Sequence, residues 1–133
     1  MRSIFVNLPV NDLEKSKAFF GALGFSINPQ FSDDKAACVV VDEYIYCMLH
    51  THERFRDFIT GEISDAFKAT EVLNALSAES REEVDAFLAK AVKAGGREWK
   101  PPQDHGFMYQ TSFQDLDGHV WEIVWMDPAA VQG

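Results

Sequence analysis

Glu122 is the residue of this chain whose surroundings most favour chemistry. It stands in residues 120–125, which follow an Asp-Gly turn signal and are rich in β-branched and aromatic types, a pattern that predicts a strand. Because side chains alternate along a strand, Glu122 shares one face with Val120 and Val124. The opposite face is apolar and carries Trp121, Ile123 and Trp125. A carboxylate among valines either finds a partner in a cavity or is simply solvated on an exposed face.

A second group of candidates precedes the penultimate strand. His105 is followed by Gly106, which frees the backbone beside a titratable ring, and Tyr109 comes shortly after it. We expect His105 and Tyr109 to border a ligand pocket, with His105 and Glu122 as a base and an acid near neutral pH. The alternative interpretation is a histidine that caps a turn and a tyrosine in the core.

Two further patterns have the residue types of metal or redox chemistry. His50 and His52 would share a face if both lay in one strand and so could chelate an ion; alternatively they are exposed where the strand meets a loop. Cys38 and Cys47 lie at equal distances from an expected Asp42-Glu43 turn, which predicts that they face each other. A disulfide is then possible, although a reducing cytosol favours two packed thiols.

The elements that position these residues repeat once along the chain. The first half predicts a strand, a helix N-capped by Asp12 and ended by Gly24, and three strands at about 26–31, 35–41 and 44–49. The second half predicts a strand at 71–78 and a helix that begins with a Ser80–Glu83 capping box. Its remaining strands are expected at about 97–99, 108–114 and 120–125. Both halves therefore have the order β-α-β-β-β.

An offset of 68 residues superposes the two halves and predicts an internal duplication. We expect module one at 1–50, a link or lid at 51–70 and module two at 71–127, all within a single 133-residue domain. The formal net charge of −9 argues against nucleic-acid and anionic-membrane partners, and no apolar run approaches the length of a membrane span. Without a signal-peptide pattern, we expect a cytoplasmic protein.

At this level the sequence resembles the vicinal oxygen chelate superfamily, which groups glyoxalase, bleomycin-resistance and extradiol-dioxygenase-like proteins. The matching segments are residues 8–20 (LPVNDLEKSKAFF), 23–25 (LGF) and 115–122 (DLDGHVWE). The resemblance implies an α+β fold in which two tandem β-α-β-β-β modules form a curved mixed sheet around a cavity, with the helices outside. It also implies a homodimer, since relatives often dimerise.

Many members of that superfamily hold a divalent metal ion in the cavity with one residue from the first strand and one from the last strand of each module. By the resemblance, these four positions are Phe5, Cys47, Leu73 and Glu122, with Cys47 uncertain by one residue. Phe and Leu offer no donor to a hard ion. We therefore expect no cofactor, and Glu122 as the ligand if a divalent metal binds at all.

Strand parity predicts the walls of the cavity. The expected ligand contacts besides Glu122 and Tyr109 are Phe5, Asn7, Cys47, Leu73, Ala75 and Val124. This apolar cup with few polar groups predicts a site for a small, partly apolar molecule. Two alternatives stay open: a metal-dependent lyase or dioxygenase with the rearranged ligands Glu122, His105, His50 and Cys47, and a non-catalytic protein that sequesters a ligand or drug.

Overall fold

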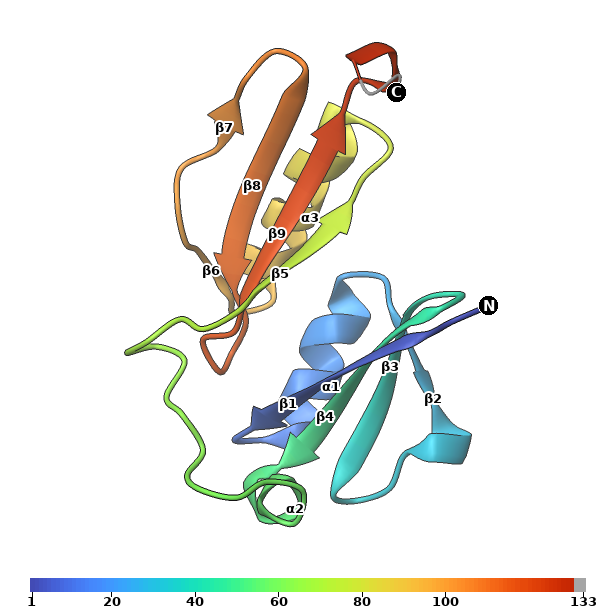
Figure 1. Cartoon of the computed structure of the whole chain (residues 1–133), viewed down its shortest axis with the longest axis vertical. Coiled ribbons are helices and arrows are strands. Elements are labelled where there is room, and N and C mark those ends of the chain that lie inside the picture. Colours follow the sequence, from blue (N-terminus) through green and yellow to red (C-terminus); the bar gives the residue numbers. More distant parts are fainter. Residues whose placement is uncertain (131–133) are drawn as a thin grey trace. The chain divides into compact units, whose positions relative to one another are not determined.

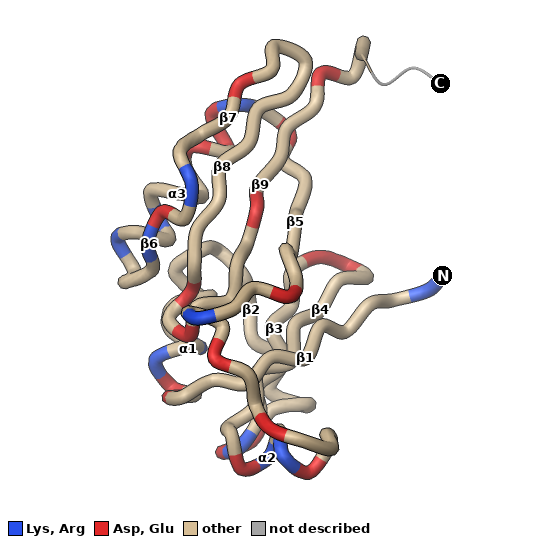
Figure 2. Tube along the Cα trace, turned by 60° about the vertical axis from the view of Figure 1, so that its left-hand side comes forward, with Lys and Arg blue, Asp and Glu red and all other residues tan. Residues whose placement is uncertain are grey.

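The computed structural model describes residues 1–130 and divides the chain into two compact units, Met1–Asp65 and the part from Ala66 onward (Figure 1). Each unit contains one mixed β-sheet with a long helix packed on it, so the fold is α+β. In the described part of the chain no helix is long and apolar enough to cross a membrane. Acidic residues are spread over both units, in keeping with the net charge of −9 (Figure 2).

The first unit is a four-stranded sheet in the order β1-β4-β3-β2. Strand β1 runs parallel to β4, and the other neighbours are antiparallel. Its elements are β1 (Ile4–Val10), α1 (Leu13–Ala22), β2 (Ser26–Asn28), the 3-10 helix η1 (Pro29–Phe31), β3 (Ala36–Asp42), β4 (Ile45–Thr51) and α2 (His52–Arg56).

The second unit repeats this plan with the order β5-β9-β8-β6, and β7 also pairs with β8. Strand β5 is parallel to β9, as β1 is to β4. Its elements are β5 (Leu73–Ser77), α3 (Arg81–Lys93), β6 (Arg97–Glu98), β7 (Gln103–Asp104), β8 (Met108–Gln114), β9 (Val120–Met126) and the 3-10 helix η2 (Pro128–Ala130).

Both long helices begin at the residues that the sequence predicts. The side chain of Asp12 accepts a hydrogen bond from the backbone N of Lys15 at 3.1 Å, and Ser80 accepts from the backbone N of Glu83 at the same distance. These caps satisfy amide groups that have no partner inside the helix. The two N-cap residues lie 68 positions apart, so the predicted offset holds from strand to helix.

Each helix covers one face of its sheet and closes a small core. In the first unit Phe19 and Phe20 of α1 are buried with Val39, Cys47 and Leu49 of the sheet. In the second unit the buried residues include Val84 and Ala91 of α3 and Phe113, Trp121 and Ile123 of β8 and β9. Burying side chains of this size stabilises the fold by about 1.5–3 kcal/mol for each large one. The opposite face of each sheet is free of α1 or α3 and can hold a site.

The predicted pairing of Cys38 with Cys47 is wrong by one residue. Cys38 pairs with Met48, and Val39 pairs with Cys47, because a bulge interrupts the β3–β4 ladder near the hairpin. Neighbouring residues in a strand point to opposite faces, so the two thiols lie on opposite sides of the sheet. Both cysteines are buried, neither is in a disulfide, and this geometry does not permit a disulfide between them.

The strand expected at 26–31 is also shorter than predicted. It ends at Asn28, whose side chain accepts from the backbone N of Gln30 at 3.0 Å and caps the 3-10 helix that begins with Pro29. Proline fixes its own φ and lacks an amide hydrogen, so it ends the ladder and begins the helical turn.

Candidate functional site

The open face of the second sheet carries Glu122. In the parallel β5–β9 ladder Ala75 pairs with Glu122, and on β8 Ser112 lies opposite it. Leu73, Ser77 and Val124 are on the same face by alternation. Trp121 and Ile123, only 3% and 0% exposed, lie on the other face toward α3, so the alternation predicted for this strand is observed.

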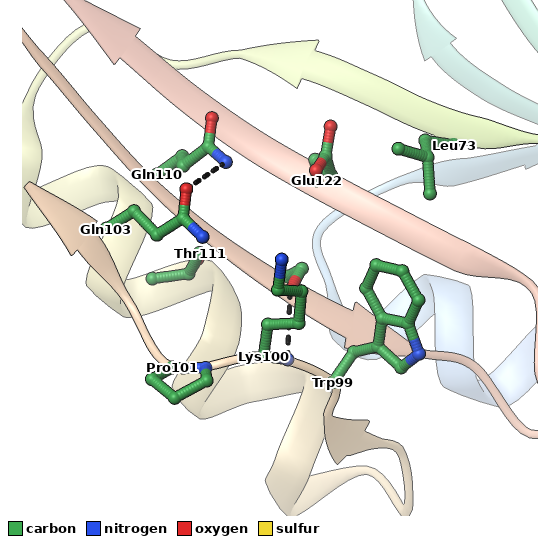
Figure 3. Close-up of a pocket in the computed structure, with 9 residues that line it drawn as sticks. Leu73, Trp99, Lys100, Pro101, Gln103, Gln110, Thr111 and Glu122 are labelled. Atoms are coloured by element: carbon green, nitrogen blue, oxygen red, sulfur yellow. Dashed lines mark hydrogen bonds between the residues drawn. The ribbon is translucent and has the colours of Figure 1, made fainter.

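A pocket of about 140 Å³ lies over Glu122, and its walls come from the sheet and from the segment that joins β6 to β7. Figure 3 shows the Lys100 side chain rising between the Gln103–Gln110 pair and Trp99, on the side of the sheet that carries Glu122. The pocket thus combines a carboxylate, an ammonium group and amides with an indole and the side chain of Leu73.

Hydrogen bonds fix the joining segment against β8. The backbone N of Trp99 donates to the carbonyl O of Ser112 at 3.0 Å, and the backbone N of Lys100 donates to the Ser112 hydroxyl at 3.2 Å. Farther along, Nε2 of Gln110 donates to Oε1 of Gln103 at 3.3 Å. The pocket wall is therefore organised before any ligand arrives, which reduces the entropy lost on binding.

Sequence reasoning missed Trp99, Lys100, Gln103 and Gln110 as pocket residues. The signal available for Gln110 was parity, because it lies two positions before Ser112 on β8 and therefore on the same face. For the joining segment the signal was Pro101-Pro102, which favours extended backbone that can lie along a strand.

The Glu122 carboxylate is half-buried, and no other residue within 1–130 gives it a hydrogen bond or an ion pair. An ionised carboxylate offers acceptors only, with about four lone-pair positions. This group is consequently available to a ligand that brings a hydrogen-bond donor or a positive charge.

His105 and Tyr109 do not join Glu122. His105 is exposed in the turn between β7 and β8, and its backbone N donates to the carbonyl O of Met108 at 2.8 Å. Met108 pairs with Met126, four residues along β9 from Glu122, a separation of about 13 Å at the usual strand rise. The predicted acid–base pair of His105 and Glu122 is therefore not assembled.

Tyr109 points to the α3 face, not to the open face. Its hydroxyl donates to Oδ1 of Asp85 at 2.6 Å, and this bond raises the pKa of the phenol. Arg81 of α3 lies over the ring at 5.2 Å and over the ring of Trp125 at 5.1 Å. Tyr109 is thus part of the helix–sheet packing, which is the alternative that its sequence context left open.

Arg81 also anchors the hairpin that carries His105. It donates to both carboxylate oxygens of Asp104 at 2.8 and 3.0 Å and to the carbonyl O of Gly106 at 2.9 Å. The hydrogen bond from Arg81 lowers the pKa of Asp104 to about 2. The guanidinium group therefore holds the tip of this hairpin on α3 and away from the Glu122 pocket.

In the first unit, Phe5 and Asn7 lie on the open face as predicted, but Cys47 does not. Phe5 pairs with Tyr46, and the two rings stack at 4.8 Å, while Asn7 pairs with Met48. Cys47 points into the core beneath α1 and is 1% exposed. Its predicted place in the pocket wall is therefore corrected: Cys47 pairs with Val6 in the β1–β4 ladder, one residue before Met48 on the open face.

The comparisons with known proteins agree with this architecture. A model of the bleomycin resistance protein-like N-terminal family matches residues 2–42. The hypothetical protein SA1046 from S. aureus is 31% identical, with a TM-score of 0.80 and 94% of each chain covered. A glyoxalase/bleomycin resistance protein from Albidiferax ferrireducens T118 is 26% identical, with a TM-score of 0.66, covering 91% of this chain and 95% of that one.

The chain belongs to the vicinal oxygen chelate superfamily. A fosfomycin resistance protein, FosX from Listeria monocytogenes, shares the fold at 19% identity, with a TM-score of 0.69 and coverage of 94% of this chain and 93% of that one. A search of curated proteins found no match to the sequence.

The residues at the metal-holding positions of the superfamily do not fit a divalent ion in this chain. Asn7 and Ala75 lie 68 positions apart and pair with Met48 and Glu122. Met48, not Cys47, is therefore the counterpart of Glu122, and the four positions are Phe5, Met48, Leu73 and Glu122. One carboxylate and one thioether fall short of the three protein ligands usual at a catalytic zinc, and a thioether is too soft a donor for a hard ion.

Other donors do not replace the missing ligands. Among residues 1–130 no three His, Cys, Asp or Glu side chains form a group that could hold a metal ion. His50 lies within β4, one residue before its end, whereas His52 is the first residue of α2. The two histidines therefore do not share a strand face, as chelation would require. His50 instead lies 2.8 Å from Asn7, between Nε2 and Oδ1.

Proposed function

We propose that this superfamily member binds a small, partly apolar molecule on the open face of its second sheet, without the metal ion that many relatives use. Glu122 acts as the hydrogen-bond acceptor or base toward that ligand. The observation that carries the proposal is a half-buried carboxylate, without a protein partner in the described chain, in a pocket whose walls are held by hydrogen bonds.

The pocket residues indicate what the ligand must offer. Glu122 calls for a donor or a positive charge, and Lys100 calls for an acceptor or a negative charge. Trp99 and Leu73 supply an apolar surface for the rest of the molecule. A volume of about 140 Å³ is below the roughly 300–1,000 Å³ of drug-sized sites. A compact amphoteric molecule, or one end of a larger one, therefore fits best.

The same geometry favours binding over metal-dependent lyase or dioxygenase chemistry. The rearranged ligand set would need His105 beside Glu122 and Cys47 on the open face, and neither condition is met. A sequestering protein of the drug-resistance kind uses the same pocket and differs only in the absence of turnover. The names of similar proteins give the two probes for this question, bleomycin and fosfomycin.

Metal analysis is the first test. We expect protein purified in metal-free buffer, as wild type and as Glu122→Gln, to bind less than stoichiometric zinc, manganese or nickel by mass spectrometry. Glu98→Gln is the matched control, because Glu98 is an exposed acid of the same sheet outside the pocket. One equivalent of metal that Glu122→Gln loses and Glu98→Gln keeps would reject the metal-free proposal.

Ligand binding is the second test. A probe at a hundred times its Kd stabilises the folded state by about 2.7 kcal/mol, which raises the melting temperature measurably. We expect Glu122→Gln to reduce that rise for bleomycin, which carries amine and amide donors, and Lys100→Met to reduce it for the anionic phosphonate fosfomycin, whereas Glu98→Gln reduces neither. Stabilisation without chemical change of the probe supports sequestration, and equal stabilisation of all variants would refute a ligand role for Glu122.

We also propose that the protein is a cytoplasmic homodimer. Two buried cysteines that form no disulfide are typical of a reducing compartment. Strands β1 and β5 are sheet edges with the exposed apolar residues Ile4 and Leu73, which are suited to pair with another chain. Light scattering coupled to size-exclusion chromatography measures the mass directly, and a 15.0 kDa species across the concentration range would exclude a stable dimer.

A further inference from the structure

Ser112 lies at the floor of the pocket over Glu122 and separates two long side chains. Glu122 of β9 pairs with Ser112 of β8, and on the other side of β8 the backbone N of Lys100 donates to the Ser112 hydroxyl at 3.2 Å. Neighbouring strands lie about 4.8 Å apart, so the backbones of Glu122 and Lys100 are about two strand spacings from each other. Because serine is small, it leaves open space between the carboxylate and the ammonium group, and all three residues line the pocket.

The two opposite charges share one pocket without neutralising each other. Glu122 is half-buried and Lys100 is exposed, and within residues 1–130 neither side chain forms an ion pair. A molecule that brings only one charge would displace water from the other protein group and give it no partner, which is unfavourable. The pocket therefore favours a ligand that carries both a positive and a negative charge.

The rest of the pocket has an apolar end and an amide end. Leu73 and Trp99 lie at the apolar end, and the hydrogen-bonded pair of Gln103 and Gln110 lies at the other (Figure 3). Nε2 of Gln110 donates to Oε1 of Gln103, so Nε2 of Gln103 keeps its own hydrogens for a ligand. The charged groups lie between these two ends, which gives a bound molecule a defined orientation.

We propose that the ligand of this pocket is a free amino acid with an apolar side chain, bound as its zwitterion. The inference rests on the proposed function, because it requires Glu122 to be the acceptor of a ligand site. The ammonium group of the ligand donates to the Glu122 carboxylate, and the carboxylate of the ligand accepts from Nζ of Lys100 and Nε2 of Gln103. The apolar side chain of the ligand packs against Trp99 and Leu73.

The two charges distinguish a free amino acid from related molecules. An amino acid within a peptide has neither charge, since its amino and carboxyl groups are both in amide bonds. A simple amine or a simple carboxylic acid of the same size matches only one of the two protein groups, and a site built for a polar contact strongly disfavours an analogue that lacks it. L-Leucine, which has both charges and an aliphatic side chain, is therefore a suitable probe.

Isothermal titration calorimetry of the full-length protein at neutral pH tests the proposal with L-leucine and two analogues. Isopentylamine is leucine without its carboxylate, and isocaproate is leucine without its ammonium group. We expect each analogue to bind the wild type about tenfold more weakly than leucine. The reason is that each analogue loses one hydrogen bond between charged groups and leaves one charge of the pocket without a partner.

Two variants assign the ends of the ligand to their protein partners. Glu122→Gln should weaken the binding of leucine and isopentylamine about tenfold, but not the binding of isocaproate. Lys100→Met should weaken the binding of leucine and isocaproate by a similar factor, but not the binding of isopentylamine. Glu98→Gln and Lys93→Met are the matched controls, because both residues are exposed charges of the same unit outside the pocket. They should leave the binding of all three probes unchanged.

Failure of this inference and failure of the proposed function give different results. Leucine that binds no more tightly than either analogue, or that binds Lys100→Met as well as wild type, would overturn the amino-acid assignment. So would an absence of leucine binding beside bleomycin binding that depends on Glu122. In these cases a loss of binding in Glu122→Gln for any probe keeps Glu122 as a ligand acceptor. If Glu122→Gln alters the binding of no probe, bleomycin included, the proposed function fails together with this inference.

Discussion

Gly118 lies in the turn that leads into β9, and replacing it should strongly destabilise the fold. Its φ is +86°, a region that residues with a Cβ rarely adopt. An added Cβ would lie 2.8 Å from the backbone N of Phe67 and 2.9 Å from two carbons of its ring. The turn has little freedom to relax, because Gly118 donates to the carbonyl O of Asp115 at 3.2 Å and accepts from Nε2 of Gln114 at 3.2 Å.

Two terms set the expected loss of stability in Gly118→Ala. The left-handed backbone costs about 1–2 kcal/mol for a residue with a Cβ, and the close approach to Phe67 adds about 1–3 kcal/mol, as overpacking does. Gly106→Ala isolates the first term, because Gly106 has a φ of +81° and no atom within 4 Å of an added Cβ. We therefore expect losses of about 2–5 kcal/mol for Gly118→Ala and about 1–2 kcal/mol for Gly106→Ala.

Urea unfolding of wild type and both variants measures these losses. With an m-value of about 1–3 kcal/mol per molar urea, the Gly118→Ala midpoint should fall further than the Gly106→Ala midpoint, by the additional contact term of about 1–3 kcal/mol divided by the m-value. An unchanged m-value is required for this comparison, since a changed one would mean that the unfolded state or the cooperativity has altered. Equal midpoints for the two variants would refute the argument from the Phe67 contact.

Three further predictions concern buried or paired ionisable groups. The Asp115 carboxylate accepts hydrogen bonds from the backbone N of Asp117 and His119 and from Nε1 of Trp121. Asp115→Asn should therefore lower the free energy of unfolding by about 2–4 kcal/mol in the same urea assay. Asp34→Asn, at an exposed position, is the control and should change it by less than about 0.5 kcal/mol. Because the pKa of His50 is lowered in the folded state, its contribution to stability is present above pH 6.5 and is lost as the pH falls. His50→Phe should therefore reduce the slope of unfolding free energy against pH by up to about 1.4 kcal/mol per pH unit. The same slope in wild type and variant would contradict this. The lowered pKa of Asp104 means that the small difference in melting temperature between wild type and Asp104→Asn should disappear between pH 3.8 and about 2.

Local signals in the sequence predicted the helices and the carboxylate strand correctly. Asp12 and Ser80 cap their helices because the geometry of an N-cap involves only the next three residues. The alternation around Glu122 held because one face of β9 is strongly apolar, and such a face fixes the register of a strand. In both cases the information lies within a few neighbouring residues.

The register of the β3–β4 hairpin could not be predicted from such local signals. The sequence places a turn at Asp42-Glu43, but Asp42 pairs with Ile45 and the bulge lies just before it. A slip of one residue moves every side chain of a strand to the other face. That slip explains why Cys47 does not face Cys38, whereas its place in the cavity wall was expected from the family resemblance, which was uncertain by one residue at this position.

The far wall of the Glu122 pocket was missed for a different reason. Trp99 and Lys100 reach the site because a segment without regular pattern folds back onto β8 and bonds to Ser112. Ser112 is 12 positions away from Lys100 in sequence, and nothing in the local composition identifies it as the partner. Sequence patterns therefore predicted the strand side of this pocket and not the loop side.

Because the second unit repeats the plan of the first, their strand positions can be compared one by one, and equivalent positions carry different polar residues. Pro9 and Ser77 lie 68 positions apart and pair with His50 and Val124, so His50 is the counterpart of Val124. The first unit thus carries an imidazole two residues along β4 from Met48, and Met48 is the counterpart of the carboxylate residue Glu122. The second unit thus has a carboxylate that lines a pocket, whereas the imidazole of the first unit is buried against Phe55 and Phe58.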